Sequence, residues 1–262
     1  MKKIILTILL VLFFVFSQNA IAQKASDSIS GDINPKWGFL AEPYLMFPNM
    51  KGTTGIGNLP NTEVDADPSD IFSNLQVGAM LYMEASKDKW HIATDFIYMN
   101  LKQDIEPKLI INGGYLRAKQ LAFNVTGLYS VNSWLDVGIG GMLNSIKLET
   151  NISAIGEVFE SENTETWFDP MLIARTQSEP KATFVYQVRA DIGGFGIGSD
   201  FAYQLQFYAG YRFSKLFQLT GGYRIIGLDY EKGSQASITS GSDYFLYDMI
   251  TFGPVIRLGF SF

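Results

Sequence analysis

The chain has 262 residues, of which 47% are hydrophobic, 14% aromatic and only 18% charged, with 25 glycines and no cysteine. The lack of cysteine excludes disulfides, thiolate metal sites, a cysteine nucleophile and a lipid-modified N-terminal cysteine. A formal net charge of −6 and the lack of a basic stripe argue against a nucleic-acid partner.

Residues 1–22 read as a secretory signal peptide. Two lysines precede an apolar run over 4–16, and a small-x-small motif follows at 20–22. The apolar run is too short for a transmembrane helix, which needs about 20 residues. We expect the mature chain to start near Gln23, with a periplasmic tail over 23–36 and a single domain over 37–262.

Beyond the tail, apolar and polar side chains alternate along the chain. In the run 75–85, for example, Val77, Leu81 and Met83 lie on one face, and Gln76 and Glu84 lie on the other. Successive side chains of a strand point to opposite sides, so each such run predicts a strand with one apolar face. Ten candidate strands follow, roughly over 37–48, 73–86, 90–99, 120–129, 135–144, 167–176, 182–192, 201–212, 217–229 and 251–262.

The connections between these runs alternate in length. We predict short turns near 87–89, 131–133, 177–181 and 213–216. Long loops are expected near 49–71, 103–114, 150–166, 192–199 and 231–246. No later stretch is apolar for 18 residues, and only helices and closed barrels satisfy their backbone hydrogen bonds in a bilayer. The pattern predicts an all-β fold: a transmembrane antiparallel up-and-down β-barrel of about ten strands, with eight or twelve as alternatives.

Aromatic residues support this interpretation, because they gather near the short-turn ends, where an interfacial girdle is expected. The predicted girdle residues are Trp37, Trp90, Trp134, Phe213, Phe217 and Phe262. A soluble barrel or sandwich would alternate in the same way. The polar faces, however, hold Gln, Asn, Thr and Gly with few Lys or Glu, unlike a solvated surface, and the last strand ends on an aromatic residue.

Several segments together resemble a group of mostly uncharacterised Gram-negative outer-membrane β-barrel proteins. They are "WGFLAEPYLMFP" (37–48), "GGFGIGSD" (193–200), "GYR" (210–212 and 222–224), "LDYEKG" (228–233) and "GPVIRLGFSF" (253–262). The resemblance covers nearly the whole mature chain. It implies a barrel in the cell outer membrane, surrounded by lipid and lipopolysaccharide, with the terminal Phe262 presented to the barrel-assembly machinery during biogenesis. It implies no catalytic residues.

Charged residues on the predicted lumen face are segregated along the chain. The first five strands contribute Glu42, Glu84, Asp95 and Asp136, and the last five contribute Arg175, Arg189, Asp191, Arg212, Arg224 and Arg257. In a closed barrel the two arcs face one another, and arginine suits bidentate pairing with carboxylates. Such a network would either plug the lumen or line a narrow solute path.

The single histidine, His91, is the one candidate for histidine-dependent catalysis. It lies on the lumen face, and Asp95 follows on the same face about 13 Å away, too far for a hydrogen bond. Catalysis would need a cross-strand partner that the alternation does not identify. We therefore expect a structural lumen histidine, no enzyme, no cofactor and no metal site.

The function expected from the sequence is a structural barrel or a narrow, porin-like solute path with a charge-paired lumen. Two alternatives stay open. One is a lipid- or peptide-processing enzyme that uses His91, and the other is an adhesin or receptor that uses the long loops. The sequence does not determine a substrate or an oligomeric state.

Overall fold

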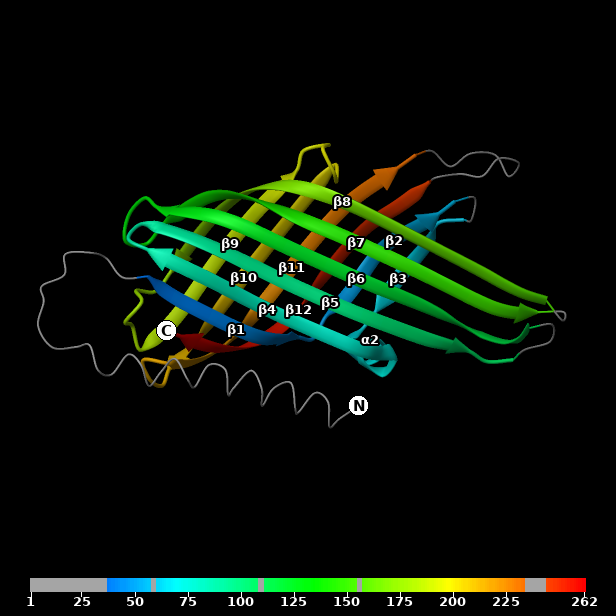
Figure 1. Ribbon diagram of the computed structural model, residues 1–262, viewed down its shortest axis with the longest axis horizontal. Coiled ribbons are helices and arrows are strands. Elements are labelled where there is room, and N and C mark those ends of the chain that lie inside the picture. Colours follow the sequence, from blue (N-terminus) through cyan, green and yellow to red (C-terminus); the bar gives the residue numbers. More distant parts are fainter. Residues whose placement is uncertain (1–36, 58–59, 108–110, 155–156, 234–243) are drawn as a thin grey trace, which may run out of the picture. The chain divides into compact units, whose positions relative to one another are not determined.

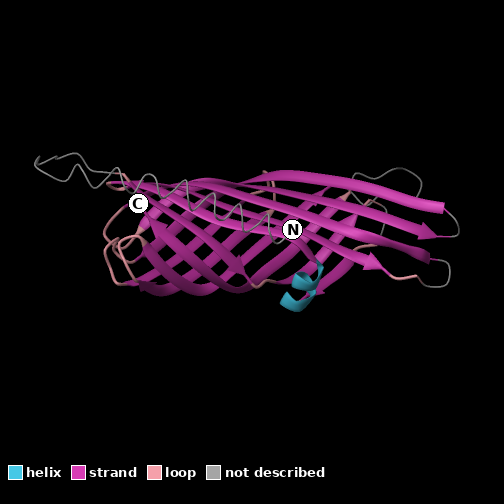
Figure 2. Ribbon diagram, turned by 60° about the horizontal axis from the view of Figure 1, so that its bottom comes forward, coloured by secondary structure: helices cyan, strands magenta, loops and turns pink. Residues whose placement is uncertain are grey.

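The computed structural model describes residues 37–57, 60–107, 111–154, 157–233 and 244–262 (Figures 1 and 2). The expected signal peptide and tail lie outside these residues. The described elements are β1 (Gly38–Met46), β2 (Asn49–Ile56), β3 (Thr62–Ala66), α2 (Pro68–Asn74), β4 (Leu75–Lys87), β5 (Trp90–Ile105), β6 (Ile111–Ser130), β7 (Asp136–Ala154), β8 (Glu157–Gln177), β9 (Phe184–Gly194), β10 (Phe201–Arg212), β11 (Phe217–Lys232) and β12 (Phe245–Ser261). Among them, no helix is long and apolar enough to cross a membrane.

Ten strands close into an antiparallel barrel. From β4 to β12 each strand pairs with the next one in the chain, and β1 joins both ends by pairing with β4 and with β12. The last residue, Phe262, exchanges backbone hydrogen bonds with Phe39 at 3.1 and 2.8 Å. The predicted ten-stranded barrel is therefore confirmed.

Side chains alternate between the two faces of the wall. Ile256, Leu258 and Phe262 in and after β12 are 49%, 42% and 49% exposed, whereas Arg257 between them is 1% exposed. The same contrast holds along β7, where Ile139 is 69% exposed and Asp136 is buried. The exterior is thus apolar and the interior is charged, as a closed barrel in a bilayer requires.

The first barrel strand is broken at Phe47–Pro48. Before the break, β1 pairs with the C-terminal half of β12; after it, β2 pairs with the N-terminal half, from Phe245 to Phe252. The hairpin partner β3 and the helix α2 follow, and a capping box between Asp67 and Asp70 starts this helix. The prediction of a loop over 49–71 is therefore wrong, because two strands and most of a helix occupy it.

Strands β6, β7 and β8 are much longer than the predicted runs, with 20, 19 and 21 residues. They extend past the ends of the other strands in Figure 1, where they are drawn in green. Predicted loops over 103–114 and 150–166 are therefore largely strand. Alternation fails to reveal these segments because both faces of a sheet outside the apolar band of the membrane contact water. We call residues 111–119, 145–154 and 157–166 the projecting sheet.

The short turns agree with the sequence. The connections β4–β5, β6–β7, β8–β9 and β10–β11 fall at the predicted positions. On the opposite side, the glycine-rich segment 193–200 forms the β9–β10 connection, as expected for a hairpin. Gly194 and Gly196 have φ of +84° and +71°, a conformation that favours glycine.

Candidate functional site

The lumen of the barrel holds nearly all of the charged residues that the sequence assigned to it. Of the acidic residues, Glu42, Asp95, Asp136 and Asp191 are at most 5% exposed; among the arginines, Arg175, Arg189, Arg224 and Arg257 are at most 2% exposed. The remaining ones, Glu84, His91 and Arg212, are half-buried. Charges at this depth persist only when they are paired and hydrogen-bonded.

Three arginines of the basic arc form four ion pairs with carboxylates of the acidic arc. Arg257 Nη1 lies 3.0 Å from Glu42 Oε2, and Arg224 Nη2 lies 2.7 Å from Asp95 Oδ2. Arg175 binds Glu84 and also Asp136, the latter at 2.9 Å. The Arg224–Asp95 and Arg175–Glu84 pairs cross the lumen and join β11 to β5 and β8 to β4, which are far apart in the wall. The other two pairs join the neighbouring strands β12 and β1, and β8 and β7.

Two predicted lumen arginines have other partners. Arg189 pairs with Asp191 two residues along its own strand, at 2.8 Å, and not across the lumen. Arg212 donates to Gln218 Oε1 at 2.8 Å, and Gln218 in turn donates to Glu42 Oε1 at 2.9 Å. The Arg212 guanidinium is therefore linked to the acidic arc through an amide.

Arg257 occupies a cage of three tyrosines. Its guanidinium carbon lies 3.7 Å from the ring centre of Tyr208, 5.0 Å from that of Tyr82 and 5.4 Å from that of Tyr44. Aromatic faces attract a desolvated cation. With Glu42 beside it, the cage places side chains from β1, β4, β10 and β12 together inside the lumen.

Sequence reasoning did not single out the tyrosine cage or the glutamines that bind the arginines. Tyr44 donates to Asp95 Oδ1 at 2.7 Å and accepts a hydrogen bond from Arg224, also at 2.7 Å. The sequence did contain a signal for the tyrosines. Tyr44 lies two residues after Glu42, and Tyr82 lies two residues before Glu84, so each tyrosine is expected on the same lumen face as its acidic neighbour.

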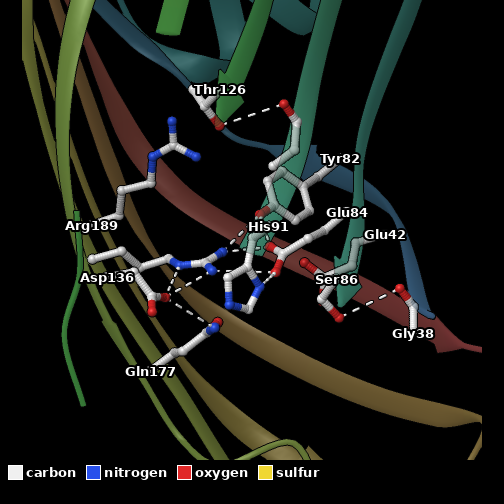
Figure 3. A network of polar contacts seen from close by, with 12 residues as sticks. Gly38, Glu42, Tyr82, Glu84, Ser86, His91, Thr126, Asp136, Gln177 and Arg189 are labelled. Atoms are coloured by element: carbon white, nitrogen blue, oxygen red, sulfur yellow. Dashed lines mark hydrogen bonds and ion pairs between the residues drawn. The ribbon is translucent and has the colours of Figure 1, made fainter. Parts of the chain in front are cut away.

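Nearer the short-turn end, five side chains form a closed ring of polar contacts, of which Figure 3 labels Glu84, His91 and Asp136. His91 Nδ1 lies 2.7 Å from Glu84 Oε1, and His91 Nε2 lies 3.1 Å from Ser130 Oγ. Ser130 donates to Asp136 Oδ1 at 2.6 Å, and Arg175 closes the ring by binding Asp136 and Glu84. The cross-strand partners that His91 lacked in the sequence are therefore Glu84 and Ser130.

This ring contains the order serine, histidine, carboxylate that nucleophilic hydrolases use. Two contacts weaken the likeness. The single Ser130 proton is directed to Asp136, so it is not available to His91, and Arg175 and Tyr82 already bind Glu84. In this arrangement the five side chains use their hydrogen-bonding groups on one another. The ring therefore acts as a structural link between strands.

Two cavities lie on either side of the ion pairs. The one towards the short-turn end has a volume of about 200 Å³, and Glu84, His91, Arg212 and Arg257 help to line it. The other, towards the long-loop end, has about 30 Å³ and reaches down to Arg224. The Arg257–Glu42 and Arg224–Asp95 pairs occupy the lumen between them.

The predicted girdle aromatics lie at the short-turn end. Five of the six are 49–66% exposed and Phe217 is half-buried, and they stand in or beside the strand ends: Trp37, Trp90, Trp134, Phe213, Phe217 and Phe262. Trp90 packs edge-on against Tyr129 at 4.9 Å, and Phe217 contacts Phe213 and Phe260. Amphipathic rings in this position suit a membrane–water interface.

A closed antiparallel barrel with an apolar exterior, an aromatic end and a charged lumen defines the class of protein: an outer-membrane β-barrel. No family model and no curated protein matches the sequence. Among solved structures, the chain is similar to the protease OmpT from Escherichia coli, with 8% identity, a TM-score of 0.40 and coverage of 91% of this chain and 99% of that one.

Two further barrels have similar scores. They are the attachment invasion locus protein Ail of Yersinia pestis (10% identity, TM-score 0.36, 88% and 100% of the two chains) and the translocator domain of the autotransporter NalP from Neisseria meningitidis (12%, 0.34, 95% and 96%). Similarities this low concern barrel architecture alone and carry no argument about activity.

Proposed function

We propose that the protein is a non-enzymatic barrel of the Gram-negative outer membrane whose lumen is plugged, so that it serves as a structural element and not as an open pore. The observation that carries this proposal is Arg257, which is 1% exposed and lies inside the lumen between Glu42 and the rings of Tyr44, Tyr82 and Tyr208. Moving this cation aside would leave Glu42 buried and unpaired, at a cost of about 3–5 kcal/mol.

Conductance in planar lipid bilayers tests the plug. We expect the wild-type barrel to be silent and the double variant Glu42→Ser, Arg257→Ser to conduct, because it removes the central pair without leaving an unpaired charge. Circular dichroism must show that the variant retains its strands. Steady openings of the wild-type protein would instead support the narrow solute path.

A second candidate is a hydrolase, and the contacts of His91 with Ser130 and Glu84 favour it. For this activity Ser130 must release Asp136 and donate to His91, so that its oxygen can attack an ester or amide carbonyl. A fluorophosphonate tests the idea, because attack by Ser130 Oγ displaces fluoride while His91 takes the proton. We expect Ser130→Ala to abolish labelling and Ser86→Ala, a neighbouring lumen serine, to preserve it; an unlabelled wild type removes the candidate.

A third candidate is recognition at the cell surface by the projecting sheet. Its charges are clustered: Glu149 lies within 3.4 Å of Arg117, Lys119 and Lys147. Because Glu149 pairs with Glu162 across β7 and β8, residues 150–161 can be replaced by a two-residue turn without a change of register. Loss of binding to cells by this shortened but folded barrel would support recognition, and unchanged binding would oppose it.

A further inference from the structure

The cavity towards the long-loop end has walls that are unusual for a barrel lumen. Five of the nine methionines line it: Met46, Met80, Met99, Met142 and Met249. Ile97 and Leu228 add to the same wall. The interior of an outer-membrane barrel is ordinarily polar because it contacts water. An apolar wall is not what a water-filled lumen would have. Methionine is flexible and polarisable, and it is over-used at surfaces that adapt to apolar ligands.

Two polar atoms at the floor of the cavity have no hydrogen-bond partner among the described residues. They are Asn124 Nδ2 and Asn144 Oδ1, on side chains that are 5% and 2% exposed. The register places Asn124 opposite Met142 and Asn144 opposite Ala122, so the two amides are diagonal neighbours on β6 and β7. One free donor and one free acceptor match a hydroxyl group, which both accepts and donates.

Within the described part of the chain, the floor offers no charged group that lacks a partner. Arg224 borders the cavity, but it already donates to Gln204 and Tyr44 and pairs with Asp95. Above the cavity, aromatic rings close the lumen, since Trp167 stacks on Tyr230 at 4.2 Å and contacts Tyr247 at 5.9 Å. The ligand that fits this space is therefore uncharged, and it does not enter along the barrel axis.

A seam in the barrel wall lies beside the cavity. β1 pairs with β4 only from Gly38 to Pro43, although β1 continues to Met46 and β4 starts at Leu75. The six steps from Gly38 to Tyr44 rise about 20 Å along the strand, which is about 15 Å along the membrane normal at a tilt of about 35–45°. The seam therefore opens in the outer half of a hydrocarbon layer about 25 Å thick. Met46 and Met80, one from each side of the seam, line the cavity.

The helix α2 lies next to this seam. Its Ile71 is 3% exposed, and the ring of its Phe72 lies 5.6 Å from that of Phe47, at the break between β1 and β2. Side chains of a short helix thus replace strand pairing at this point. Such packing separates more easily than a ladder of backbone hydrogen bonds in lipid, where each unpaired group is costly.

From these contacts we infer that the cavity binds a slender apolar molecule with a single uncharged hydroxyl end, such as a fatty alcohol. The hydroxyl lies between Asn124 and Asn144, the chain packs against the methionines, and entry is from the outer leaflet between β1 and β4 beneath α2. Binding requires the flexible methionine side chains to rotate, because the present cavity of about 30 Å³ is smaller than such a chain. This site is compatible with a plugged lumen, because it lies above the Arg224–Asp95 pair.

Trp167 offers a direct measurement of binding. Replacement of Trp37, Trp90 and Trp134 by Phe leaves Trp167, which is 5% exposed and pairs with Asn144 across β7 and β8, as the single tryptophan. In lipid nanodiscs, a bromine-tipped fatty alcohol of about twelve carbons should quench it saturably. In the same background, Ala122→Phe fills the cavity and should weaken quenching at least tenfold.

The matched control is Ala174→Phe, the same substitution at an exposed position of β8. It should bind like the parent. Asn124→Leu should weaken binding about tenfold, since one hydrogen bond to the hydroxyl is lost. The inference is overturned if the parent shows no saturable quenching, or if Ala122→Phe, folded by circular dichroism, binds as well as Ala174→Phe.

The seam has its own test, which the absence of native cysteine makes clean. In the same single-tryptophan background, a short thiol cross-linker between Phe47→Cys and Phe72→Cys should slow the onset of quenching at least tenfold. The single variant Phe47→Cys, treated in the same way, should keep the normal rate. Equal rates in both would reject entry beneath α2.

Discussion

The two halves of the lumen are filled by different kinds of side chain. Towards the short turns, carboxylates, arginines and tyrosines bind one another across the barrel. Towards the long loops, methionines, Ile97 and Leu228 surround a small cavity with unpaired amide atoms at its floor. The charged half has specific, directional contacts that resist rearrangement, whereas the apolar half is held by packing that adapts.

The largest expected effect is in the charged half. Arg257→Ala removes the caged cation and leaves Glu42 buried without its partner, so it should lower the free energy of unfolding by about 3–5 kcal/mol. The measurement is urea unfolding of the barrel in liposomes. Glu42→Gln combined with Arg257→Met should recover most of the loss; if it does not, the cage and not the ion pair stabilises this half.

In the apolar half the expected effect is smaller. Met142→Ala enlarges a cavity whose walls can partly collapse, so we expect a loss of about 2 kcal/mol, at the low end for buried methionine. Met83→Ala, on the outer face where lipid fills the gap, is the control and should cost about 0.5 kcal/mol. A loss for Met142→Ala as large as that for Arg257→Ala would erase the contrast between the halves.

The smallest effect belongs to the projecting sheet, outside both halves. The hydrogen bond from Lys119, with those from Arg117 and Lys147, lowers the pKa of Glu149 to about 2. A lowered pKa means that the stabilisation is present above the unfolded value of about 4.3 and is lost as the pH falls towards 2. Hydrogen exchange at the tips of β6 and β7 should therefore increase over that range.

Glu149→Gln provides the control for this titration. It should raise exchange at neutral pH only slightly, because ion pairs at a protein surface contribute about 0–1 kcal/mol, and it should remove the acid-dependent increase. A variant that keeps the full acid dependence would show that another group of the projecting sheet titrates.

Much of the barrel wall could be predicted because a bilayer imposes alternation on every strand. The alternation of side chains along a strand is enough to predict that Ile256 and Leu258 face outwards and that Arg257 faces inwards. The positions of the short turns follow from the points where this alternation stops. The same logic failed at 49–71 and 150–166. In 49–71 a broken strand, a hairpin and a helix follow one another, and in 150–166 both faces of the sheet contact water. Neither situation imposes an alternation of apolar and polar residues.

The position of a residue in the alternation determines which face its side chain occupies, but not which residue it contacts. The sequence alone therefore established a barrel, its charged interior and the two opposed arcs of acids and arginines. Only the tertiary structure decided that Arg189 pairs within its own strand, that Ser130 and Glu84 reach His91, and that three tyrosines surround Arg257. These choices depend on barrel register and curvature, which bring strands distant in sequence to the same level of the lumen.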